Sequence, residues 1–231
     1  MTHPDQRVTA EDDGSDADLD WRAFLVGGGV FLISGISLVV HILTGAPLAV
    51  VLGVLVLGGG LTVAVTMSTR PAARAHWRRL VGVGTVVGLV GTVAYDGSRW
   101  LLVQVAGFHT SPFKALPFFG QALVGSMGGT TGRTVAGIGF HVLNGCAFGI
   151  AYTVWFGRRH PIWGVAFAMG LEAFMLALYP GWLDVRSVQE LTSISLLGHV
   201  VYGVTLGGVA RFLLGRRPLP GGPRPLPVPD R

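Results

Sequence analysis

The chain alternates between long apolar runs and short polar connections. The runs that approach the length of a membrane span lie at about 22–44, 48–67, 80–105, 135–156, 162–179 and 193–214. A transmembrane helix needs about 20 predominantly apolar residues. The pattern therefore predicts an all-α protein whose membrane domain, residues 21–215, is a polytopic bundle of six transmembrane helices.

One further apolar segment, 113–130, does not fit this pattern. It is shorter, it contains Lys114 and Gln121, and Pro117 interrupts it. Proline and several glycines suit a broken helix, which a membrane protein tolerates where the backbone is covered by protein. We predict a re-entrant or interfacial helix here and not a seventh span.

Arginine clusters orient the predicted bundle. They follow the second, fourth and last runs and consist of Arg70, Arg74, Arg78 and Arg79, then Arg158 and Arg159, then Arg211, Arg216 and Arg217. Loops rich in Lys and Arg face the cytoplasm. Six spans place all three clusters on that side, whereas a seventh would move two of them outside. The excess of arginine over lysine favours a bacterial source. We therefore predict a multi-pass protein of the bacterial inner membrane, with both termini in the cytoplasm.

Polar ends flank this membrane domain. Residues 1–20 hold seven of the twelve acidic side chains and are predicted to be a disordered tail, and 216–231 hold six of the thirteen prolines and are predicted to be an extended tail. Only 13% of the residues are charged, whereas a soluble domain carries about 25%. The net charge of +5 comes from arginines between apolar runs, so membrane lipid is the predicted partner and nucleic acid is not.

Glycine pairs at GxxxG spacing occur inside three of the predicted spans. They are Gly84 and Gly88, Gly145 and Gly149, and Gly203 and Gly207. In lipid this spacing lets two helix backbones approach closely. These faces are therefore predicted to be close helix contacts, and an oligomer formed through them is one prediction.

The polar side chains within the predicted spans gather in the outer half of the membrane. An ionisable residue there costs about 2–3 kcal/mol or more, so it needs a partner or a function. We predict a cavity open to the outside, with Glu172, His199, His141 and Asp96 as candidate catalytic residues and Asn144, Tyr202, Tyr179 and Arg99 as candidate binding residues. Structural alternatives are an Asp96–Arg99 ion pair at i,i+3 and histidines that only hydrogen-bond across a glycine seam.

A short motif occurs twice among these residues. His141-Val-Leu-Asn-Gly145-Cys-Ala-Phe-Gly149 and His199-Val-Val-Tyr-Gly203-Val-Thr-Leu-Gly207 both read H-V-x-x-G-x-x-x-G, and both place the histidine about six residues into its run. With the flanking residues of 140–149 and 197–207, the C-terminal third resembles the YagU-like bacterial inner-membrane proteins. That resemblance implies a polytopic membrane protein without an agreed activity, and it assigns no functional residue.

Several hypotheses follow from these residues. The first is a protein that binds or moves a small solute or protons, supported by Glu172 at mid-depth and by the broken segment 113–130. The second is a membrane enzyme that acts on a lipid or isoprenoid, using either a divalent metal on His141, His199 and Glu172 or Glu172 as an acid. A lesser alternative is a haem held by His141 and His199. The fourth hypothesis is a structural or accessory subunit.

Overall fold

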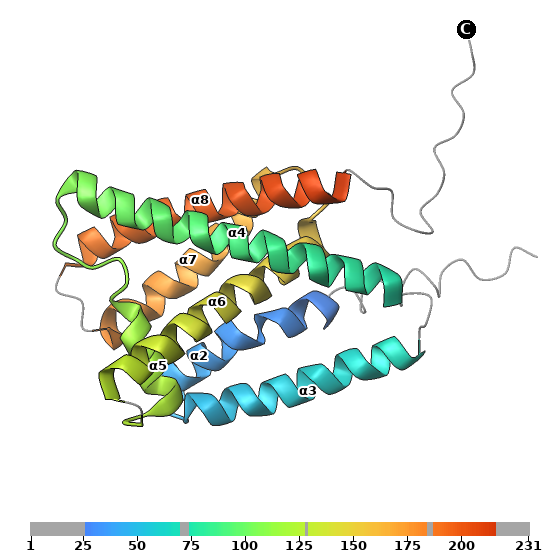
Figure 1. Cartoon of the computed structure of the whole chain (residues 1–231), viewed down its shortest axis with the longest axis horizontal. Helices are drawn as coiled ribbons and strands as arrows, with labels where there is room; N and C mark the ends of the chain where they lie inside the picture. Colours follow the sequence, from blue (N-terminus) through green and yellow to red (C-terminus); the bar gives the residue numbers. More distant parts are fainter. Residues whose placement is uncertain (1–25, 70–73, 128, 184–186, 216–231) are drawn as a thin grey trace, which may run out of the picture.

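A computed structural model of the protein describes residues 26–69, 74–127, 129–183 and 187–215 (Figure 1). In these ranges the chain forms helices and no strands. They are η1 (Val30–Leu32), α2 (Ile33–Thr44), α3 (Leu48–Thr69), α4 (Arg74–Ala106), α5 (Ala115–Val124), α6 (Gly129–Phe156), α7 (Ile162–Trp182) and α8 (Val188–Gly215). The predicted tails, 1–20 and 216–231, lie outside the described residues.

Six of the helical segments are long and apolar enough to cross a membrane. They are Val26–Thr44, Leu48–Val65, Arg74–Ala106, Gly129–Phe156, Ile162–Trp182 and Val188–Gly215. Each coincides with one predicted run, so the prediction of an all-α bundle with six membrane-spanning helices is confirmed.

Helix α4 packs against both α6 and α8 and is antiparallel to each, while α7 packs against α8 (Figure 1). A methyl group placed on Gly88 would overlap the carbonyl oxygen of Gly145, and one placed on Gly164 would overlap that of Gly203. The absence of side chains at these positions is what lets the backbones meet. The three predicted GxxxG faces therefore contact other helices of the same chain, and an oligomer stays a prediction.

The antiparallel packing gathers the described arginines of the three clusters at one end of the bundle. This is the end where α4 begins and where α6 and α8 finish. The opposite end carries α5, and we call it the α5 end. The arrangement agrees with the six-span prediction, and the side of the membrane that each end faces stays a prediction.

Helix α5 is the predicted re-entrant segment. It lies antiparallel against the first half of α6, because Gly137 meets the carbonyl of Leu116 while Gly120 meets that of Arg133. Gly137 is about 12 Å along α6, at 1.5 Å per residue. After α4 the chain thus turns back into the bundle, and α5 then runs towards the end of the bundle where α6 begins. As a result, residues 111–116 contribute to the lining of the cavity described below.

The N-terminal pair, α2 and α3, packs less tightly than the rest. Gly45, in the left-handed region at φ 72°, ends α2 and its N–H donates to the His41 carbonyl oxygen at 2.8 Å. Helix α3 is apolar on every face and exposes most of its side chains, as expected for a helix surrounded by lipid. Helix α2 lies closer to the other helices and forms a wall of the cavity described next.

Candidate functional site

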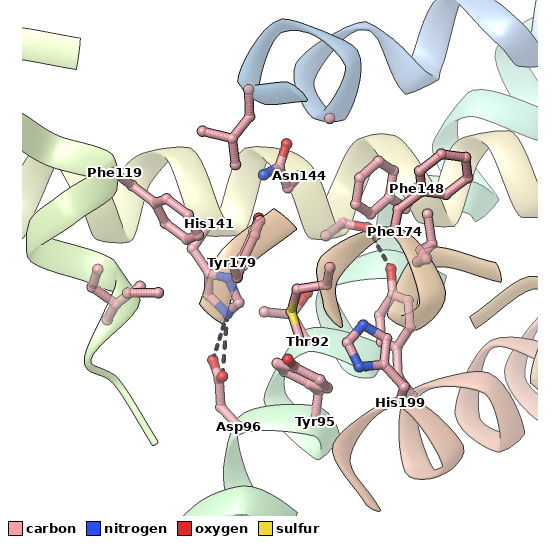
Figure 2. Close-up of a pocket in the computed structure, with 18 of the residues that line it drawn as sticks. Thr92, Tyr95, Asp96, Phe119, His141, Asn144, Phe148, Phe174, Tyr179 and His199 are labelled. Atoms are coloured by element: carbon pink, nitrogen blue, oxygen red, sulfur yellow. Dashed lines mark hydrogen bonds and ion pairs between the residues drawn. The ribbon is translucent and has the colours of Figure 1, made fainter. Parts of the chain in front are cut away.

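A cavity of about 380 Å³ lies inside the bundle, towards the α5 end (Figure 2). Helices α2, α4, α5, α6, α7 and α8 line it together with the loop before α5. Of the eight predicted site residues, the lining includes seven: Asp96, Arg99, His141, Asn144, Tyr179, His199 and Tyr202. The eighth, Glu172, is not in the lining but lies behind His199. The structure therefore gathers the candidates that the sequence had placed at similar depth.

Glu172 and His199 form a buried pair between α7 and α8. The Glu172 Oε2 atom lies 2.8 Å from His199 Nδ1 and accepts a hydrogen bond of 2.6 Å from the Ser195 hydroxyl. His199 Nδ1 also lies 3.0 Å from the Ser195 carbonyl oxygen. Because a carbonyl oxygen only accepts, we assign the ring proton to Nδ1. Nε2 is then left without a hydrogen-bond partner in the described part of the chain, on a ring that lines the cavity.

Asp96 and His141 form a second pair between α4 and α6. His141 Nε2 lies 3.0 Å and 3.2 Å from the two carboxylate oxygens of Asp96, as the dashed lines in Figure 2 mark. Arg99 Nη1 lies 3.6 Å from Asp96 Oδ1, so the predicted i,i+3 ion pair is present. In this pair Nδ1 is the ring nitrogen that has no hydrogen-bond partner within the described ranges, the reverse of His199.

Tyr95 joins the two pairs, and the sequence analysis did not identify it. Its ring centroid is 5.0 Å from that of His199 and 6.1 Å from that of His141, and the Arg99 guanidinium carbon lies 4.6 Å from the centroid. Ser195 was missed as well. Its position four residues before His199 was the available signal, because i,i+4 residues share a helix face.

The other predicted binding residues have different surroundings. Tyr202 donates a hydrogen bond of 3.1 Å to the Gly145 carbonyl oxygen, and Tyr179 packs in an aromatic cluster with Phe119 and Trp182. Asn144 is buried, and its Oδ1 has no hydrogen-bond partner among the described residues. The Tyr202 hydrogen bond therefore links α8 to α6, whereas the Oδ1 atom of Asn144 remains available to a ligand.

The predicted metal set is not assembled. Each histidine takes its own carboxylate, and no group of three or more His, Cys, Asp and Glu side chains in the described ranges is arranged to hold a metal ion. A haem between the histidines does not fit either, because Tyr95 is in ring contact with both imidazoles. His141 with Asp96 and His199 with Glu172 thus form two hydrogen-bonded pairs and not one ligand set.

Fold and site together define a helical membrane protein with an internal cavity and two His–carboxylate pairs. The chain belongs to DUF6789, a family of unknown function, whose model matches residues 78–220. The match includes both pairs, Tyr95 and Ser195, and excludes α2 and α3. No curated protein and no solved structure matches the chain. The resemblance to YagU-like proteins is not shown, although a family without an assigned activity agrees with what it implied.

Proposed function

We propose that the protein binds a small solute in this cavity and that His141 and His199 hold or exchange protons with its polar part. One observation carries the proposal. Both imidazoles line the cavity, and each is bound to a carboxylate through one ring nitrogen while the other nitrogen has no hydrogen-bond partner among the described residues.

The chemistry of such a pair supports the proposal. A carboxylate on one ring nitrogen fixes the tautomer and the orientation of the imidazole, which leaves the second nitrogen to bind or transfer a proton. Ionisable groups within a membrane domain are costly, and they commonly mark solute or proton pathways. Two such pairs in contact with one Tyr95 ring offer two proton-binding sites within a single cavity.

A membrane enzyme that acts on a lipid is the second candidate. The observation in its favour is His199, which Glu172 orients through Nδ1 as in a general base. A serine nucleophile is excluded for Ser195, because its hydroxyl donates to Glu172 and lies 3.4 Å from the same Nδ1 atom and not beside Nε2. This enzyme would therefore use His199 to move a proton on an apolar substrate.

Native mass spectrometry tests the binding proposal directly. The full chain is incubated with a total lipid extract of the expression host, in detergent, and bound small molecules are detected as added mass. We expect a discrete adduct on the wild type and its loss from Val39→Trp, since Val39 lines the cavity. Leu43→Trp, on an exposed position of the same helix, is the matched control and should keep the adduct.

Identical adducts on all three proteins would contradict solute binding in the cavity. Products that appear only in the presence of protein with an intact His199, and not with His199→Gln, would instead favour the enzyme. Both readouts come from one sample, because the extract can be analysed after the protein is removed.

Proton exchange is tested in vesicles. Proteoliposomes with an entrapped pH-sensitive dye receive a pH step under a potassium–valinomycin clamp. We expect faster relaxation with the wild type than with empty liposomes, and slower relaxation with Glu172→Gln. Glu190→Gln is the matched control, because Glu190 does not line the cavity and a glutamine oxygen there can still accept the hydrogen bonds from Thr110. Equal rates for wild type and Glu172→Gln would remove proton movement from the proposal.

A further inference from the structure

We infer that the ligand of the cavity is a single-chain amphiphile with an anionic head group, carboxylate or phosphate, which enters sideways between α2 and α7. This inference rests on the proposed function and specifies its ligand. The head would lie at Arg99 and the chain would extend towards the lipid. Three sets of observations support it.

Arg99 has unused hydrogen-bonding capacity inside the membrane. Its residue surface is only 9% exposed, it lines the cavity, and its Nε is buried without a hydrogen-bond partner in the described part of the chain. A guanidinium has five N–H donors. Its Nη1 atom lies 3.6 Å from Asp96 Oδ1, which is beyond the usual hydrogen-bond length. The guanidinium lies over the face of the Tyr95 ring. A planar anion would satisfy the remaining donors in pairs.

The charges of the lining also favour an anion. Asp96 is the one acidic side chain in it, whereas Arg99, Lys114 and the two histidines are basic. Asp96 is already shared between His141 and Arg99, so its charge is largely matched before a ligand arrives. Asn144 adds a buried amide without a partner for its oxygen, and an amide can present either its oxygen or its NH₂. The polar end of the cavity is therefore suited to a small anionic group.

The opposite end of the cavity is apolar and reaches the surface of the bundle. Figure 2 shows Phe148 and Phe174 at the far side of the lining from Asp96. Phe174 of α7 is 67% exposed and Ile36 of α2 is 46% exposed, yet both line the cavity. A side chain can do both only where the cavity meets the outer surface. That surface belongs to membrane-spanning helices, so the opening faces lipid.

At the α5 end a loop covers the cavity, although Ser111 and Phe113 of that loop line the cavity and are exposed. The lining there consists of Ser111 to Lys114 of the loop and the first residues of α5, and Glu190 of α8 accepts hydrogen bonds from the Thr110 N–H at 2.9 Å and hydroxyl at 2.6 Å. This tie holds the loop over the end of the cavity. A volume of about 380 Å³ is near the lower limit of about 300 Å³ for small-molecule sites. It suits a head group and part of one chain, with the remaining chain in lipid.

The test compares ligands that share one tail and differ in their head. Dodecanoate, dodecyl phosphate, dodecanol and dodecylamine are titrated by native mass spectrometry against the full chain in detergent. We expect the two anions to bind at least about tenfold more tightly than dodecanol, as a charge-assisted pair should. Preference for the carboxylate or for the phosphate then distinguishes a fatty acid from a phosphorylated lipid alcohol, and either preference supports the inference.

Variants then test whether Arg99 causes the preference for an anionic head group and whether the ligand enters beside α2. Arg99→Gln should reduce anion binding to the level of dodecanol, and Arg99→Lys should keep part of the preference. Arg133→Gln is the matched control, because Arg133 is an exposed partner of Gln121 and does not line the cavity. Ile36→Trp should weaken all four ligands, whereas Leu43→Trp should not. If Arg99→Gln does not fold, the ratio of anion affinity to dodecanol affinity in the wild type still tests the preference for an anionic head group.

The outcomes separate the two proposals. Equal binding of dodecanol and both anions, or tighter binding of dodecylamine, would overturn the anionic head while leaving a solute-binding cavity in place. Equal loading of wild type and Ile36→Trp would overturn entry between α2 and α7. If no ligand binds the wild type and the lipid extract gives no adduct, the proposed function itself fails.

Discussion

The two His–carboxylate pairs contain the same chemical groups in different surroundings. Glu172 and His199 are both buried, and the acid is supported by the Ser195 hydroxyl. Asp96 has 26% of its side-chain surface exposed, and it shares its charge between His141 and Arg99. The first pair is thus enclosed by α7 and α8 and reaches the cavity only through the His199 ring, whereas both members of the second pair line the cavity. We therefore expect Glu172–His199 to contribute more to stability, and Asp96–His141 with Arg99 to contribute more to contact with the proposed ligand.

Removing the enclosed acid should have the largest effect. Glu172→Ala leaves the His199 ring and the Ser195 hydroxyl buried without this acceptor, and each unsatisfied buried polar group costs about 1–3 kcal/mol. Glu172→Gln should cost less, since its amide oxygen still accepts. The measurement is the free energy of unfolding in mixed micelles with increasing dodecyl sulfate. Equal losses for Ala and Gln would show that the hydrogen bonds at this carboxylate are unimportant.

Removing the cavity-facing acid should cost less. Asp96→Ala leaves His141 and Arg99 without a carboxylate, and an unsatisfied buried polar group costs about 1–3 kcal/mol. The exposed part of the site lets water replace some of the lost contacts. The same unfolding measurement should therefore rank Asp96→Ala below Glu172→Ala. The opposite rank would contradict the division between an enclosed and a ligand-facing pair.

Replacing the residue that both pairs share should have an intermediate to small effect on stability. Tyr95→Leu removes ring contacts with both imidazoles and the cation–π contact with Arg99, which is worth about 0.5–2 kcal/mol. Histidine NMR signals of both pairs should shift together in this variant. Val93→Leu, at a strongly exposed position on the same helix, should shift neither. A shift of only one signal would mean that Tyr95 does not couple the pairs.

The smallest expected effect involves no change in stability and concerns the ring proton. In ¹⁵N NMR spectra at about pH 9, well above the usual histidine pKa of about 6.5, His199 should be the Nδ1–H tautomer. His141 should be the Nε2–H tautomer, because that nitrogen is the one at Asp96. Single His→Gln variants assign the signals. The same tautomer at both residues would refute the difference that the hydrogen bonds imply.

The sequence was sufficient for the spans and for the general location of the site. Hydropathy predicted all six helices, the arginine clusters predicted that 113–130 does not cross, and helical spacing predicted the pairing of Asp96 with Arg99. These features depend on local pattern and on distance along a single helix. For the same reason, similar depth was enough to predict that His141 and His199 line one cavity.

The partners across helices could not be predicted. Which carboxylate binds which histidine depends on how far each helix is rotated about its axis, and the sequence of one helix does not determine this. The roles of Tyr95, of Glu172 behind the lining and of α2 as a wall became visible only in the folded arrangement. The glycine pairs predicted close contact, but their partners on other helices followed from packing.

The cavity is lined by helices inside the region that the family model covers and by one helix outside it. Its polar groups come from α4, α6, α7 and α8, all within the region that the family model covers, whereas α2 lies before that region. A chain that keeps the family region behind a different N-terminal helix would offer the same head-group site with another surface for the tail. Helix α2 thus shapes the cavity without supplying any side chain of the two pairs, so exchanging it would alter the proposed tail surface and leave the proposed head-group site unchanged.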